Sequence, residues 1–215
     1  LLSNVRAPDY TAPDRMPVTR LYRVSPMAVL GIVIMGAGVV GWFISLPLIA
    51  LQNGFSDSQA SFALVVAMLA AAVSQYPIGW LSDRIDRRYV VIGLSLISVA
   101  AAAWMAIDRD PGRIVAGYAV IAAVTLPVYS ILAAHANDQL SAGQIIPASG
   151  TMAFLLQLGQ FIGMLVAPNL IRLADGRGLQ FMLIAVGLVV AAIAVTRRVQ
   201  SVAPEETGEA QAMGI

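Results

Sequence analysis

The chain has 215 residues, of which 59% are hydrophobic and only 12% are charged, and its mean hydropathy is +0.80. A soluble domain of this length could not hide so much apolar surface in one core, so lipid must be part of its solvent. The net charge is only +1, and the arginine clusters flank apolar segments without interleaved aromatic residues. This pattern argues against nucleic acid as a partner.

The first 23 residues contain four arginines and three prolines but no apolar stretch, so they do not form a cleavable signal peptide. We expect residues 1–23 to be a poorly ordered, basic cytoplasmic arm. Because the chain begins with leucine, we expect a fragment whose arm ends a loop between two halves of a longer protein. A complete six-helix protein is the alternative.

Six apolar runs follow the arm, and a helix needs roughly 20 residues to cross the hydrocarbon core. They cover residues 24–50, 58–80, 90–107, 113–135, 147–171 and 178–196. This predicts an all-α membrane protein with six transmembrane helices in one domain, residues 24–198. Residues 199–215 are expected to form a disordered cytoplasmic tail with three glutamates.

The orientation follows from the basic residues, because arginines near the ends of spans are retained in the cytoplasm. All thirteen basic residues are arginines. If the N-terminus is cytoplasmic, nine of them lie on the inner side of six spans and four on the outer side. We therefore predict a multi-pass protein of the cytoplasmic membrane with both termini in the cytoplasm.

A tight, charged turn separates the second and third runs. It reads Gly79-Trp80-Leu81-Ser82-Asp83-Arg84-Ile85-Asp86-Arg87-Arg88. Gly-x-Leu-x-Asp-Arg-x-x-Arg-Arg closely resembles the signature between the second and third helices of a six-helix half in the major facilitator superfamily of secondary transporters. That pattern has glycine where this chain has Asp86, and aspartate is one of the few other residues that adopt a positive φ.

The resemblance covers roughly residues 20–198 and includes Leu126-Pro127-Val128-Tyr129 and Ala134-His135-Ala136-Asn137-Asp138. It is to the C-terminal half of an uncharacterised bacterial member of the sugar or drug transporter-like kind. It implies two inverted three-helix repeats, and as partners the lipid bilayer, a second six-helix half and a small-molecule substrate. After the fifth run, the stretch Leu173-Ala174-Asp175-Gly176 resembles Leu81-Ser82-Asp83-Arg84 of the turn. This similarity is consistent with such repeats.

The resemblance also implies that the turn is a conformational latch, formed by Gly79, Asp83, Arg84, Arg87 and Arg88. Asp83 would accept hydrogen bonds from the start of a neighbouring helix, and the arginines would donate to a carboxylate or to a helix C-terminus. The alternative is that the arginines only anchor the turn in the cytoplasm.

Polar side chains inside a membrane usually face protein or a water-filled cavity. The fourth run carries three of them on one helical face and the fifth carries two glutamines near one stripe, whereas the sixth has none between Phe181 and Val195. We expect a substrate cavity lined by Trp42, Tyr118, Thr125, Tyr129, Gln157 and Gln160. Hydrogen bonding between helices, or for Trp42 anchoring at the membrane interface, is the alternative.

Glycines and prolines within the runs indicate how the helices pack. Gly159 and Gly163 form a Gly-x-x-x-Gly pattern, for which close helix packing is expected. Pro47, Pro127 and Pro168 are expected to kink their helices.

The sequence favours one half of a secondary transporter that moves a small neutral or hydrophobic solute by alternating access. It predicts no enzyme, no metal site and no cofactor, because the chain has no cysteine and only one histidine. A coupling proton is one option, but His135 lies at the end of a helix, where capping is expected. The alternatives are a non-transporting scaffold or receptor on the same fold, and an intramembrane serine protease using Ser149, which lacks a Gly-x-Ser-x-Gly elbow.

Overall fold

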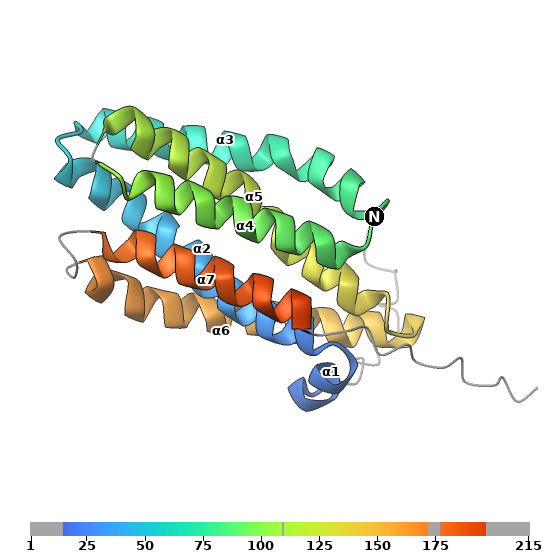
Figure 1. Cartoon of the computed structure of the whole chain (residues 1–215). Coiled ribbons are helices and arrows are strands. Elements are labelled where there is room, and N and C mark those ends of the chain that lie inside the picture. Colours follow the sequence, from blue (N-terminus) through green and yellow to red (C-terminus); the bar gives the residue numbers. More distant parts are fainter. Residues whose placement is uncertain (1–14, 109, 172–176, 197–215) are drawn as a thin grey trace, which may run out of the picture.

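The computed structural model describes residues 15–108, 110–171 and 177–196 (Figure 1). This part of the chain forms seven helices and no strand. The helices are α1 (Val18–Val24), α2 (Pro26–Gln52), α3 (Asp57–Ser82), α4 (Arg87–Met105), α5 (Pro111–Asn137), α6 (Ala142–Ile171) and α7 (Gly178–Thr196). The helices α2 to α7 are long and apolar enough to cross a membrane, which confirms the six predicted spans and the all-α class.

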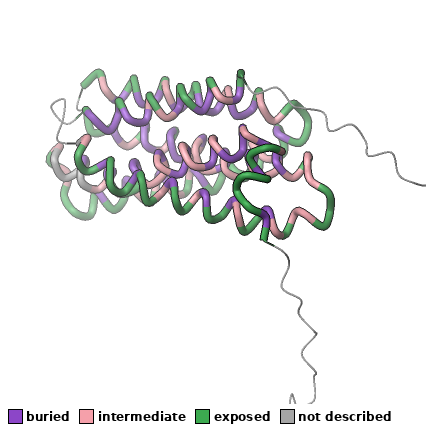
Figure 2. Tube along the Cα trace, turned by 90° about the horizontal axis from the view of Figure 1, so that it is seen from below, coloured by how far each residue is buried: buried purple, intermediate pink, exposed green. Residues whose placement is uncertain are grey.

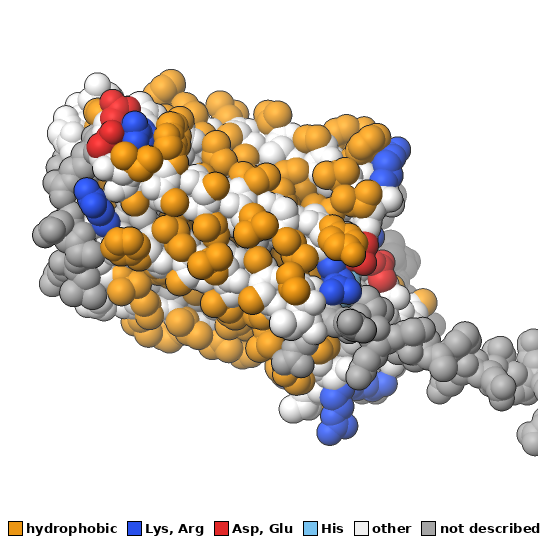
Figure 3. All heavy atoms as spheres, in the orientation of Figure 1, with side chains coloured by type: hydrophobic (Ala, Val, Ile, Leu, Met, Phe, Trp, Pro, Cys, Tyr) orange, Lys and Arg blue, Asp and Glu red, His pale blue; other side chains and the backbone are white. Residues whose placement is uncertain are grey.

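Capping residues set where the spans begin. Ser56 starts α3 with a capping box that includes Gln59. Asp86 accepts the backbone N–H of Arg88 at the start of α4 (2.8 Å), and Asp110 accepts that of Arg113 in α5 (2.8 Å). The polar connections therefore lie at the two ends of the bundle, and Figure 3 shows a belt of hydrophobic side chains between charged groups at those ends.

The helices pack as two interlocked sets of three. α2 packs against α6 and α7, and in the same way α5 packs against α3 and α4; α2 also meets α5, and α4 meets α7. Exchanging α2 with α5, α3 with α6 and α4 with α7 preserves this pattern. This exchange relates helices α2 to α4 to helices α5 to α7, and because α2 and α5 run in opposite directions (Figure 1), these two groups have the inverted arrangement that the resemblance implies.

Small residues allow α2 and α6 to approach closely. Gly159 and Gly163 of α6 lie against the backbone of Val33 and Ala37 in α2, where an added Cβ would overlap the neighbouring main chain. Gly36 of α2 also lies against the backbone of α6, at Leu156. The close packing predicted for the Gly-x-x-x-Gly pattern is thus confirmed.

The equivalent pair, α3 and α5, uses alanine and serine. Four buried alanines follow one face of α3, at positions 60, 63, 67 and 71. One turn further, the Ser74 hydroxyl donates to the Ala123 carbonyl of α5 at 2.6 Å. That carbonyl would normally accept the N–H of residue 127, but Pro127 has none. Ser74 therefore satisfies a backbone group that the proline leaves free. The helices continue through Pro47, Pro127 and Pro168, and the expected kinks stay predictions.

The poorly ordered arm expected for residues 1–23 is wrong for its described part, residues 15–23, because α1 begins at Val18 and this segment packs on the bundle. Met16 and Leu21 are buried in one cluster with Met152 of α6, and the Thr151 hydroxyl donates to the Met16 carbonyl at 2.5 Å. Figure 2 shows buried residues along the inner sides of the helices. The remainder of the arm, the tail 199–215 and the stretch 173–176 lie outside the described residues.

We predict that Gly159→Leu destabilises the bundle far more than Gly150→Leu in the same helix. The Cβ at 159 meets the α2 backbone, whereas nothing lies within 4 Å of a Cβ at 150. Overpacking costs about 1–3 kcal/mol even where side chains can adjust, and a backbone cannot. The measurement is thermal unfolding of the detergent-solubilised chain. Equal losses in the two variants would contradict the close α2–α6 contact.

Candidate functional site

Arg87 joins the ends of three helices at the end of the bundle that carries the 79–88 turn. As the first residue of α4, it donates from Nε to Asp138 (2.8 Å) and from Nη1 to Asp83 (3.1 Å) and Ser82 (3.1 Å). Asp138 caps the C-terminus of α5 and Asp83 that of α3. A planar guanidinium can hold these partners in fixed directions at once.

Arg88 ties the same turn to α7. Its Nε donates to the Ala194 carbonyl (3.1 Å) and its Nη2 to that of Val195 (3.3 Å), in the last turn of the helix. These carbonyls have no partner within their own helix, and a cation there also complements the helix dipole. Arg87 thus binds carboxylates and Arg88 binds a helix C-terminus. All of these partners belong to the six-helix bundle itself.

The other three turn residues make more local contacts. Arg84 stacks on the Trp80 ring at 3.6 Å and donates to the carbonyl of the same residue. Gly79 faces open space, with nothing within 4 Å of an added Cβ. The Asp83 side chain is 68% exposed, and among the described residues only Arg87 donates to it.

Asp86 does not adopt the positive φ that the sequence comparison suggested for this position. Its φ is −53°, and its carboxylate caps the start of α4 instead. Aspartate therefore replaces glycine in this turn because it supplies a cap, not because it adopts a left-handed conformation.

A groove between α3 and α5 opens beside this turn. It encloses about 190 Å³. Its lining consists of Gln75, Gly79, Ser82, Asp83 and Arg87 from α3 and the turn, and Pro127, Ser130, Ile131 and Ala134 from α5. The exposed carboxylate of Asp83 thus lies at the edge of an open groove.

The six residues expected to line a substrate cavity occupy three environments. Trp42 and Tyr118 are fully enclosed in one core cluster. Thr125 donates to the Ile121 carbonyl of its own helix at 2.7 Å and borders a cavity of about 20 Å³ between α2, α4, α5 and α7. Tyr129 is half-buried against the other core cluster.

On α6, Gln157 is exposed and Gln160 is half-buried. The structure therefore does not bring all six residues onto one surface, and their role as a cavity stays a prediction.

Sequence reasoning gave no role to Asp138 as a partner of Arg87 or to Ser45, and it did not predict that Trp42 and Tyr118 would be enclosed without hydrogen-bond partners among the described residues. Asp138 is the main partner of Arg87, and an aspartate at a helix C-terminus, where the dipole disfavours it, could have signalled a nearby cation. The nitrogen of the Trp42 indole and the hydroxyls of Ser45 and Tyr118 are buried without a hydrogen-bond partner among the described residues.

The alternative of a serine protease gains no support from the geometry. Ser149 donates to the Ile145 carbonyl of its own helix at 2.9 Å. His135 is buried at the turn end, where it borders a cavity with Asp83, Arg87 and Asp138. No hydrogen bond among the described residues joins this histidine to Ser149, and the same residues contain no group of three His, Asp or Glu that could hold a metal ion.

Comparison with known proteins agrees with the packing of the six spans. A family model described as Major Facilitator Superfamily matches residues 27–213, whereas a comparison with curated proteins gave no match. The matched region takes in nearly all of α2, the whole of α3 to α7 and the 79–88 turn. This multi-pass membrane chain therefore belongs to the Major Facilitator Superfamily of transporters.

Proposed function

We propose that the chain forms one half of a secondary transporter that moves a small neutral or hydrophobic solute by alternating access. The observation that carries this proposal is the exposure of α3 and α6, the two least buried spans. They lie at opposite edges of the α2–α5 pair and expose large apolar residues such as Phe62, Tyr76, Phe161 and Leu165. Two such helices fit the docking of a second six-helix half better than contact with lipid alone.

The solute is proposed to be uncharged because the walls available to it are uncharged. No Asp, Glu, Arg or Lys lies in the middle of a span, and a charged solute would need a compensating group in this low-dielectric region. The exposed polar groups are amides and hydroxyls, including Gln75 on α3, Ser130 on α5 and Gln157 on α6. Such groups orient a neutral ligand in a mostly apolar site.

Gln157 and Gln160 are the proposed solute contacts in this conformation. Trp42 and Tyr118 are enclosed between helices, so they reach a solute only after α2 and α5 move apart. The same holds for Thr125, which lies at an interior cavity. Tyr129 is half-exposed and is proposed to border the path on α5.

The turn is proposed to act as a cytoplasmic latch with two parts. Arg87 and Arg88 hold α3, α4, α5 and α7 together as one rigid end. Asp83, exposed beside the open groove, is free to accept hydrogen bonds from a helix of the other half in one of the two transport states.

Asp83→Asn in the full-length transporter should lower the transport rate while its abundance in the membrane stays near normal. Exposed ion pairs contribute only about 0.2–1 kcal/mol, so losing the contact with Arg87 should hardly affect folding. Asp138→Asn is the matched control, because it also removes one carboxylate partner of Arg87. Asp138→Asn should lower the thermal stability more than Asp83→Asn does, and it should lower the transport rate less. The same transport rate in Asp83→Asn and the unmodified protein would leave the turn as a simple anchor.

Gln157→Ala and Gln160→Ala should each raise the apparent KM for the transported solute. Losing one neutral hydrogen bond weakens binding by about 0.5–1.5 kcal/mol, or roughly 2–10-fold in KM. The measurement is uptake into proteoliposomes of whichever solute is transported from a panel of neutral sugars and hydrophobic dyes. Leu188→Ala is the control, since Leu188 is exposed on α7 away from α3 and α6. Unchanged KM values in both glutamine variants would remove them from the solute path.

Cysteine labelling tests the proposed orientation, because the chain has no cysteine of its own. A membrane-impermeant reagent added to intact cells should label Asp57→Cys and Asp110→Cys, at the exposed outer ends of α3 and α5. It should label Ile85→Cys, which is exposed in the turn, only after the membrane is permeabilised. The reverse pattern would place both termini outside.

A further inference from the structure

An open groove between α1 and α6 has no role in the proposed transport cycle. It encloses about 570 Å³ and is lined by Arg15, Met16, Pro17, Val18, Ile146, Pro147, Gly150, Thr151 and Phe154. Its floor is mainly apolar, and two of its residues are strongly exposed, Ile146 at 71% and Phe154 at 59%. A surface of this kind requires an apolar occupant in the folded protein.

The groove is a fixed part of the bundle. Met16 and Leu21 are buried on one side of the α1 segment, and the Thr151 hydroxyl holds the Met16 carbonyl. At the other end of α1, the Gln139 side chain donates to the Ser25 hydroxyl at 3.4 Å. These contacts from α6 and from the connection before it define the shape of the groove.

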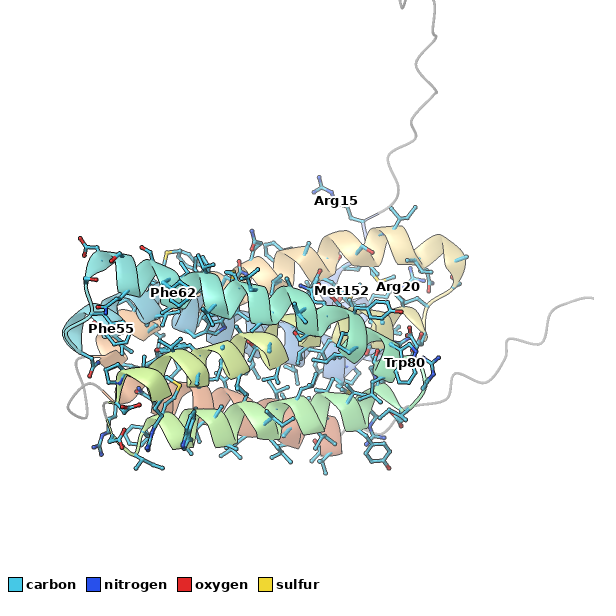
Figure 4. The ribbon with its side chains drawn as sticks, turned by 90° about the horizontal axis from the view of Figure 1, so that it is seen from above. Arg15, Arg20, Phe55, Phe62, Trp80 and Met152 are labelled. Atoms are coloured by element: carbon cyan, nitrogen blue, oxygen red, sulfur yellow. The ribbon has the colours of Figure 1, made fainter. Side chains whose placement is uncertain are left out.

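Arg15 lines this groove, and Arg20 and Arg23 follow on the adjoining helix α1. Arg15, Arg20 and Arg23 are all exposed, and none of them forms an ion pair with a described residue. Figure 4 shows Arg15 pointing away from the bundle beside α6, and Figure 3 shows further basic side chains grouped at α1. Tyr22 and Val18 are partly exposed between the arginines, so the α1 surface combines cations with apolar groups.

The position of α1 places this surface at the level of lipid headgroups. One residue separates α1 from α2, and α1 packs against α2 and α6 at the end of the bundle where α2 begins (Figure 1). Along α6, the groove residues lie between Ile146 and Phe154, whereas Gln157 and Gln160 lie further along the helix, away from its first residue Ala142. The groove is therefore nearer than the proposed solute contacts to the end of the bundle that carries the turn.

We propose that this groove binds an anionic phospholipid. An acyl chain lies against Ile146 and Phe154, and the headgroup phosphate is bound by Arg15, Arg20 and Arg23. Charge selects the ligand: basic residues beside the membrane attract anionic lipids, and each contributes roughly fivefold in affinity. A zwitterionic lipid would fill the groove without satisfying the three cations.

Quenching of a fluorophore beside the groove measures lipid occupancy. We would attach the fluorophore to Thr19→Cys, an exposed position on α1, in the full chain reconstituted into lipid nanodiscs. Brominated phosphatidylglycerol should quench it at least about fivefold more effectively than brominated phosphatidylcholine at the same mole fraction. The preference should fall at 1 M salt, where charges are screened within about 3 Å.

Two triple variants separate charge from shape. Replacing Arg15, Arg20 and Arg23 by glutamine should bring the preference for phosphatidylglycerol close to one, while replacing them by lysine should keep most of it. Arg177→Gln, which removes an exposed arginine at the opposite end of the bundle, should change nothing. Gly150→Trp, in open space within the groove, should reduce quenching by both lipids. Size-exclusion profiles of all variants confirm that the bundle is folded.

Equal quenching by the two lipids in the unmodified chain would overturn the proposal. So would a preference that survives the glutamine variant, because the lipid would then be attracted by other groups. A third outcome against it is a preference that appears only after Glu205, Glu206 and Glu209 are replaced by glutamine. In that case the acidic residues near the C-terminus, and not lipid, would neutralise the three arginines.

Discussion

Six helices of this chain must associate in lipid without the help of charge. No Asp, Glu, Arg or Lys lies in the middle of a span, and lipid tails are as apolar as the side chains that they contact. Association then depends on how closely two backbones can approach. The contact of Gly159 and Gly163 with the α2 backbone is a close approach of this kind, and α2 also packs against α5 and α7.

The two equivalent helix pairs, α2 with α6 and α3 with α5, achieve this close approach with different residues. Between α2 and α6 the small residues are glycines on both helices. Between α3 and α5 they are the four alanines of α3, followed by the hydrogen bond from Ser74 to the Ala123 carbonyl. In both pairs the small residues lie on one face only, so the opposite faces of α3 and α6 remain exposed. The same asymmetry that allows tight packing within the bundle leaves one long face of α3 and one of α6 exposed.

The spans could be predicted from sequence because length and hydropathy alone decide whether a helix can cross a membrane. The close contact at the Gly-x-x-x-Gly pattern could be predicted for a similar reason, because small residues at this spacing in a membrane helix usually allow another helix to pack closely. The order around α1 could not be predicted from arginine and proline content, because it depends on Met16 and Leu21 meeting Met152, which is more than 130 positions away.

The candidate cavity was harder still to predict. Helical spacing places Tyr118, Thr125 and Tyr129 on one face of a helix, but it does not say which neighbour that face meets. In the structure, one of the three is enclosed, one borders an interior cavity and one is half-exposed. The partner of Arg87 was missed because Asp138 lies 51 residues away in sequence, and only the pairing of α4 with α5 brings the two together.

The enclosed polar groups bear directly on the proposed mechanism. The Trp42 nitrogen and the Ser45 and Tyr118 hydroxyls lie on α2 and α5 without a partner among the described residues, and a buried polar group left unpaired costs about 1–3 kcal/mol. Any motion that separates α2 from α5 and admits water or a solute hydroxyl would recover part of this energy. Because α2 and α5 are the equivalent first helices of the two inverted repeats, such a motion would open the centre of the bundle. The same three groups would then favour a conformation with an open centre, which is the second state that the proposed alternating access requires.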